Sequence, residues 1–119
     1  MEKIGLLLKT NGEIIEYKIN MSEHTNNIGC LLNDKITFLG QLLREPEKTN
    51  AIIMYGKNAY KKGLEKNKAK LLRPFENDIY GDIFIISIDE NSEPNDFILN
   101  DYKEYNENYE CLYKKKYYM

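Results

Sequence analysis

The sequence predicts an α+β fold, in which a mostly antiparallel sheet of about five strands carries a short helix and a C-terminal helix packed on it. Three observations lead to this prediction. An Asn-Gly pair between two apolar runs near the start is a strong short-range signal for a β-hairpin. Residues 83–88 are apolar on both alternating faces, as in a central strand that is covered on both sides. Near the end, tyrosines recur at intervals of three and four residues, the spacing of one helix face.

The hairpin prediction rests on Asn11-Gly12, a pair favoured by two-residue type I′ turns because both central residues need a positive φ. A turn of this type pairs Leu8 with Ile15 and Leu6 with Tyr17. Side chains alternate along a strand, so this register gathers these apolar residues on one face. We therefore expect a hairpin with one buried face.

The elements in the middle of the chain follow from caps and apolar runs. Ser22 can cap a short helix that extends to about Leu32. Apolar stretches at 35–39 and 51–55 predict two further strands. Residues 57–78 show no clear periodicity and are expected to form a loop or a weak helix.

The last two elements carry the rest of the predicted core. On the strand 83–88, Phe84, Ile86 and Ile88 are expected to be among the most buried side chains. Asn100 can cap a final helix that extends to about residue 117. Its apolar stripe is expected to pack on the sheet and consists of Tyr102, Tyr105, Tyr109 and Leu112.

Length and composition indicate one domain over residues 1–119, with 42% hydrophobic residues to form its core. No apolar run approaches the roughly 20 residues that a membrane helix needs, and the start lacks a signal-peptide pattern. We therefore expect no membrane partner and an intracellular location, cytoplasmic or nuclear. Cys30, Cys111 and His24 are too few for a disulfide scaffold or a zinc site, so we expect no metal and no cofactor.

Lysine, asparagine, isoleucine and tyrosine are abundant, and codons rich in A and T encode all four. We interpret this bias as the mark of an AT-rich genome. A single lysine or asparagine therefore carries little weight as a functional signal.

The middle and end of the chain carry a series of short motifs that together resemble a known family. In order they are Lys35-Ile36-Thr37-Phe38-Leu39-Gly40-Gln41, Ile52-Ile53-Met54, Asn67, Arg73-Pro74-Phe75, Tyr80-Gly81-Asp82-Ile83, Asp89-Glu90, Pro94-Asn95-Asp96-Phe97 and Tyr102. They resemble a small uncharacterised family, a domain of unknown function, of large DNA viruses and some protists. The match covers roughly residues 30–105. Asn33-Asp34 departs from it where a pair of glycines is expected, and a lysine-rich segment precedes Asn67. The resemblance implies a compact domain and no particular activity.

A basic segment extends from Lys57 to Arg73 and could meet the phosphates of a nucleic acid. Its cations include Lys61, Lys62, Lys66, Lys68 and Arg73. The formal net charge of the chain is -2, which weakens the nucleic-acid interpretation. We prefer the interpretation that the segment is a solvated loop.

Two Gly-containing pairs flank predicted strands and could bring polar groups to one end of the sheet. Gly40-Gln41 follows the strand at 35–39, and Gly81-Asp82 precedes the strand at 83–88. Both glycines are also explained by turns or bulges, and neither stretch is a phosphate-binding loop. We keep these four residues as candidate binding residues.

These observations favour a non-catalytic binding or protein-interaction module, whose partner is expected to be a protein. The alternatives are a nucleic-acid-binding protein that uses the basic segment 57–73 and a small enzyme with an unrecognised site. No pair of side chains has the spacing of a catalytic centre, so no catalytic residue is predicted.

Overall fold

The computed structural model describes residues 2–44, 49–71 and 78–107. The elements in chain order are β1 (Glu2–Leu8), β2 (Ile14–Asn20), the 3₁₀ turn η1 (Met21–Glu23), α1 (His24–Leu32), β3 (Ile36–Arg44), β4 (Thr49–Gly56), β5 (Ile83–Ile88) and β6 (Pro94–Asn95). Residues 99–107, the last described segment, are helical. The predicted α+β fold is confirmed.

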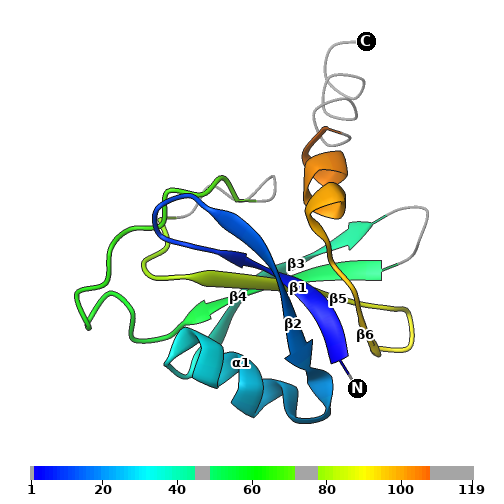
Figure 1. Ribbon diagram of the computed structural model, residues 1–119, viewed down its shortest axis with the longest axis horizontal. Helices are drawn as coiled ribbons and strands as arrows, with labels where there is room; N and C mark the ends of the chain where they lie inside the picture. The colour runs from blue at the N-terminus through cyan, green and yellow to red at the C-terminus, as the bar shows by residue number, and fades with distance from the viewer. Residues whose placement is uncertain (1, 45–48, 72–77, 108–119) are drawn as a thin grey trace.

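The strands form one antiparallel sheet in the order β2-β1-β5-β4-β3, and the short β6 pairs with the end of β5. Figure 1 shows α1 on one side of the sheet and the helical segment 99–107 on the other. The predicted central strand is confirmed, since β5 lies between β1 and β4. Phe84 and Ile86 are buried as expected, whereas Ile88 is only partly buried at the end of the strand.

Each face of the sheet has its own apolar core. On the face of residues 99–107 the buried side chains are Leu6, Leu8, Ala51, Ile53, Leu71, Ile79, Ile83, Ile85, Phe97 and Tyr102. On the α1 face they are Leu7, Ile19, Met21, Ile28, Leu32, Met54, Phe84 and Ile86. The three inner strands β1, β5 and β4 contribute to both cores, because they are covered on both sides.

The first hairpin forms, but its predicted register is wrong by one residue. Leu8 pairs with Ile14 and Leu7 with Ile15. The Lys9 amide donates to the Glu13 carbonyl at 2.8 Å, and the Gly12 amide donates to the Lys9 carbonyl at 2.9 Å. The loop therefore has three residues instead of two.

Two physical reasons account for the difference in register. Gly12 has a φ of 94°, but Asn11 does not adopt a positive φ, so the loop matches a type I turn followed by a glycine bulge. In addition, Leu6 and Leu7 are both buried, on opposite faces of the sheet. Because β1 is apolar on both faces, sorting its residues onto a single buried face could not identify the register.

β3 is longer than predicted and contains a β-bulge. Its pairing with β4 shifts between Phe38 and Gly40. Leu39 packs toward the core of residues 99–107, while Ile36 packs on the α1 core. β3 is an edge strand, because β4 is its sole partner among the described strands.

The helical segment at the end begins earlier than predicted. The Tyr102 amide donates to the Ile98 carbonyl, and Asp101 Oδ2 accepts from the Ile98 amide at 2.9 Å. Ile98 therefore occupies the N-cap position that was predicted for Asn100. The Asp101 side chain accepts from the backbone amide of this N-cap residue, as the third helical residue does in a capping box. Tyr102 is buried and Tyr105 packs on the same core, as predicted for the tyrosine stripe. Its other two members, at positions 109 and 112, lie outside the described residues.

Residues 57–71 form turns and extended chain at one end of the sheet, and the bridge of Lys66 with Tyr80 joins them to the chain that precedes β5. Asn67 is the buried polar residue that holds this segment. Its side-chain amide donates to the carbonyls of Leu8 (2.8 Å) and Gly81 (3.0 Å), and its Oδ1 accepts from the Ala69 amide (2.8 Å). One side chain thus ties together β1, the approach to β5 and the loop.

Candidate functional site

A groove of about 1230 Å³ lies on the α1 face of the sheet. Its floor consists of apolar side chains of β3, β4 and β5, namely Ile36, Phe38, Ile52, Met54, Ile86 and Ile88. One wall is α1 with the residues beside it, and another is the turn between β5 and β6, from Ser92 to Pro94. The floor side chains that α1 packs against are buried, and those beyond its reach are only partly covered.

The groove exists because a single short helix covers this face. Neighbouring strands are about 4.8 Å apart, so five strands span about 19 Å between the outermost axes. A helix with its side chains is about 10 Å across, and α1 has nine residues. α1 packs against β2, β3, β4 and β5, so it crosses the sheet, and the uncovered part of the face lies further along β3, β4 and β5, beside the β5–β6 turn.

Phe38 marks the open border of the groove. Its relative exposure is 67%, although it lies within a strand and pairs with Met54. A phenylalanine this exposed beside other apolar side chains makes a contiguous apolar surface. Cys30, in the α1 wall, is an exposed free thiol that opens onto the same groove.

Asp34 lies at the rim, at the end of α1, and holds the next turn in place. Its carboxylate accepts from the Asn58 amide (2.7 Å), the Asn58 side chain (3.0 Å) and the Lys35 amide (2.7 Å). Burial disfavours its charged form, but these hydrogen bonds and the nearby Lys62 outweigh burial and hold the pKa of Asp34 below its usual value. The carboxylate is thus engaged in structure and is not aimed at a ligand.

The two Gly-containing pairs, which could have brought polar groups to one end of the sheet, lie in different surroundings. Gly40 and Gln41 line the groove on β3. Gly81 has a φ of 79° and packs near Ala59 and Leu64, and Asp82 accepts from the Thr10 amide at 3.1 Å. The bulge beside Gly40 and the positive φ of Gly81 agree with the alternative that both glycines serve bulges or turns, and a binding role for these four residues stays a prediction.

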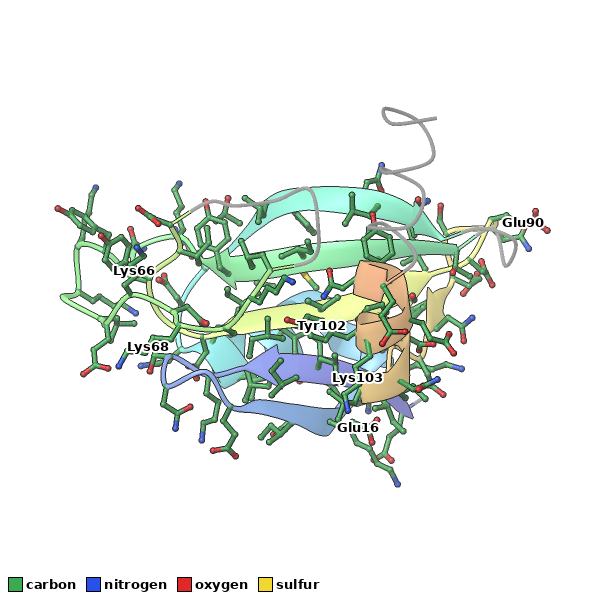
Figure 2. All side chains as sticks on the ribbon, turned by 90° about the horizontal axis from the view of Figure 1, so that it is seen from above. Glu16, Lys66, Lys68, Glu90, Tyr102 and Lys103 are labelled. Carbon is green, nitrogen blue, oxygen red and sulfur yellow. The ribbon has the colours of Figure 1, made fainter. Side chains whose placement is uncertain are left out.

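The described members of the basic segment do not form one cluster of free cations. Lys66 pairs with Asp78 at 2.9 Å, and this hydrogen bond and charge raise the pKa of Lys66. Lys62 donates to the Asn33 carbonyl beside Asp34. Lys61 and Lys68 are exposed, and Arg73 lies outside the described residues. Figure 2 shows Lys66 and Lys68 at the opposite end of the molecule from Glu90 in the acidic turn.

The sequence reasoning found Gly40 and Gln41 but missed the rest of the groove. The available signal was the stretch 36–43, which has no charged residue although it follows a short helix. An uncharged strand beside a helix too short to cover its sheet indicates an exposed apolar face.

Comparison with protein families gives one match, to a family model described as a family of unknown function, DUF5880, over residues 6–105. The chain belongs to the DUF5880 family. The match includes the last three residues of β1, α1 and all the other described strands, which agrees with the resemblance to a domain of unknown function. No curated protein and no solved structure matches the chain. Within residues 2–44, 49–71 and 78–107, no helix is long and apolar enough to cross a membrane.

Proposed function

We propose that this DUF5880 domain is a non-catalytic protein-interaction module, and that its groove on the α1 face receives an apolar helix of a partner protein. The observation that carries the proposal is the half-covered sheet face, with Phe38 67% exposed at its border. Removal of such a surface from water is favourable by about 25 cal/mol per Å² of apolar area, which offsets part of the entropy lost on association.

The dimensions of the groove favour a helix as the occupant. β4 has eight residues and is about 26 Å long, so α1, which is about 10 Å across, leaves room beside it on this face for one more helix. The floor of the groove extends across the strands from β3 to β5, about 10 Å between the strand axes, which matches a helix of about two turns. The volume of about 1230 Å³ exceeds the 300–1,000 Å³ that is usual for small-molecule sites. A second helix beside α1 would complete the helical layer on this face.

The chemistry of the walls defines the partner further. The floor is apolar, and Lys35 and Glu93 stand at separate parts of the rim. A fitting helix therefore presents apolar side chains at positions i, i+3, i+4 and i+7, with charged residues on its flanks. Gln41 remains a candidate binding residue, because its exposed amide can hydrogen-bond at the edge of the helix.

The test is selection from a displayed library of helical peptides, followed by titration of the selected peptides. We expect peptides with one apolar stripe, and we expect them to slow the alkylation of Cys30 in a variant where Cys111→Ser leaves a single thiol. Cys30→Trp places a large side chain in the groove at an exposed position and should abolish binding. Tyr17→Trp, at an exposed position on β2 outside the groove, is the matched control and should bind normally.

Two outcomes would contradict the proposal. One is selected peptides that bind Cys30→Trp as well as they bind the wild type. The other is binding that leaves the alkylation rate of Cys30 unchanged. Thermal melts of both variants show whether each is folded before the titration is interpreted.

Nucleic-acid binding through the basic segment is the second candidate, and the distance of Lys66 and Lys68 from Glu90 favours it. Against it, Lys66 is already paired with Asp78 and Lys62 lies beside Asp34. We expect no measurable binding of short DNA or RNA at physiological salt in a fluorescence anisotropy titration. Micromolar binding that is abolished by changing the four lysines 61, 62, 66 and 68 to alanine would establish this candidate instead.

A further inference from the structure

The two walls of the groove on the α1 face differ in charge. On the α1 side the lining residues from 21 to 33 are all uncharged, and they are Met21, Ser22, Ile28, Gly29, Cys30 and Asn33. Asp34 and Lys35 follow them at the end of this wall, and their opposite charges are adjacent in the chain. The α1 wall therefore carries no net charge.

The opposite wall, the turn between β5 and β6, is acidic. Glu93 lines the groove, and Glu90 is exposed in the same turn. Neither carboxylate forms an ion pair with another residue in the part of the chain that the structure describes. Asp89 adds a third acid, whose Oδ1 accepts from the amides of Asn91 (2.9 Å) and Glu93 (3.0 Å) and holds the turn. Residues 79–102 include no lysine or arginine, so no neighbour in the sequence neutralises this wall.

We propose that the partner helix carries lysine or arginine on the flank that faces the β5–β6 turn, so that the groove prefers an amphipathic helix with a basic flank to one with an acidic flank. The inference rests on the proposed function and names the charge of the partner at that site. Lysine and arginine can lay their stems along the apolar floor while their charged heads stay in water beside Glu90 and Glu93. A flank of aspartate or glutamate would bring like charges together, which disfavours the complex.

The α1 wall places a different demand on the other flank of the helix. Gly29 and Cys30 are small, and the side chains at a contact between two helices decide where in the range of about 8–10 Å their axes lie. A wall without net charge discriminates little between charged flanks, so charge specifies one flank only. Reversal of a helix in the groove exchanges its flanks. A single basic flank therefore also sets the direction in which the helix lies.

The expected preference is moderate, because Glu90 and Glu93 are exposed. An exposed ion pair changes affinity by about 1.5- to fivefold, and salt screens it. Two such pairs, together with the repulsion of an acidic flank, should make the basic flank bind about tenfold more tightly at about 20 mM salt. At about 500 mM salt the preference should fall to about twofold or less. Burial of the apolar stripe is not screened, so binding itself should persist.

Two peptides of opposite flank charge test the proposal. Both have the same apolar stripe, taken from a helical peptide that the displayed library yields, and both flanks carry lysine in one peptide and glutamate in the other. A change of both flanks makes the comparison independent of the direction of the helix. Isothermal titration at low and at high salt should show the tenfold preference for the lysine peptide and its loss with salt.

A matched pair of protein variants locates the charges that matter. The double variant Glu90→Gln and Glu93→Gln should lose most of the preference. The double variant Glu13→Gln and Glu65→Gln makes the same change in net charge at exposed positions outside the groove, and it should keep the preference. All four side chains are exposed, so both variants should fold, and thermal melts check this.

The outcomes separate this inference from the proposed function. If both peptides bind the wild type equally at low salt and Cys30→Trp abolishes both, the inference is overturned and the proposed function stands. A preference that the two double variants change to the same extent would also overturn the inference, because the turn would then have no part of its own. If Cys30→Trp binds both peptides like the wild type, the proposed function fails and the inference fails with it.

Discussion

Replacement of Asn67 tests how the loop at residues 57–71 is held to the sheet. In Asn67→Ala, the carbonyls of Leu8 and Gly81 lose their donor and the Ala69 amide loses its acceptor. A hydrogen bond contributes about 1 kcal/mol net, so we expect a loss of about 3 kcal/mol in the free energy of unfolding. Small domains have about 5–15 kcal/mol in total, so this loss is large. Urea unfolding followed by circular dichroism measures it.

Asn67→Asp sharpens this test because it retains the shape and the acceptor while it removes both donated hydrogen bonds. At neutral pH its carboxylate would face two carbonyl oxygens in a buried site, so it should be at least as unstable as Asn67→Ala. The control is Asn11→Asp, at an exposed position where the side chain accepts a hydrogen bond from the Glu13 amide, and it should change stability by less than about 0.5 kcal/mol. If Asn67→Asp is as stable as the wild type, the donor role assigned to Asn67 is incorrect.

Three further predictions follow from the core, a close backbone approach and a buried carboxylate. Ile86→Ala should lower the free energy of unfolding, measured with urea, by about 2–5 kcal/mol. We expect a value toward the lower end, because the groove admits water to the cavity left by the substitution. A loss well below this range would contradict the burial of Ile86. Gly5→Ala should destabilise the folded protein by at least about 1–3 kcal/mol, because the added Cβ would collide with the Phe84 ring and would lie 2.7 Å from the Ile85 carbonyl oxygen. A melting temperature like that of the wild type would refute this prediction. Folding lowers the pKa of Asp34, so the ionised carboxylate stabilises the folded state. This stabilisation is complete above the pKa of the unfolded chain, about 3.9, and is lost as the pH falls through the pKa of the folded state. The stability gap between the wild type and Asp34→Asn should accordingly narrow on acidification, and a gap independent of pH would show that ionised Asp34 does not support the fold.

Much of the fold was predictable from local patterns in the sequence. The apolar run at 83–88 identified both the strand and its central place, because a strand covered on both faces has no polar alternation. Ser22 marked the start of the helical region that ends at Leu32. These features depend mainly on residues that are close together in the sequence, so a local sequence pattern can predict them.

The features that were missed depend on packing across the molecule. The hairpin register could not be identified by sorting faces once both sides of β1 were buried. The bulge in β3 follows from how that strand fits against β4, and the sequence offers only Gly40 as a hint. The groove depends on how much of the strands α1 covers where it crosses the sheet, which is known only when the strand order is known. Of the candidate binding residues, Gly40 and Gln41 line the groove, and their role in binding stays a prediction.

The pairing of β1 with β5 has a consequence for how the chain folds during synthesis. Leu6 lies beside Ile85, so the inner sheet joins the first strand to one made near the end of the described chain. A nascent chain can form the β1–β2 hairpin early, but the inner edge of β1 stays without a partner until β5 has been translated. Contacts this distant in sequence slow folding and lengthen the exposure of apolar strands. The growing chain therefore leaves the inner edge of β1 exposed until β5 inserts between β1 and β4.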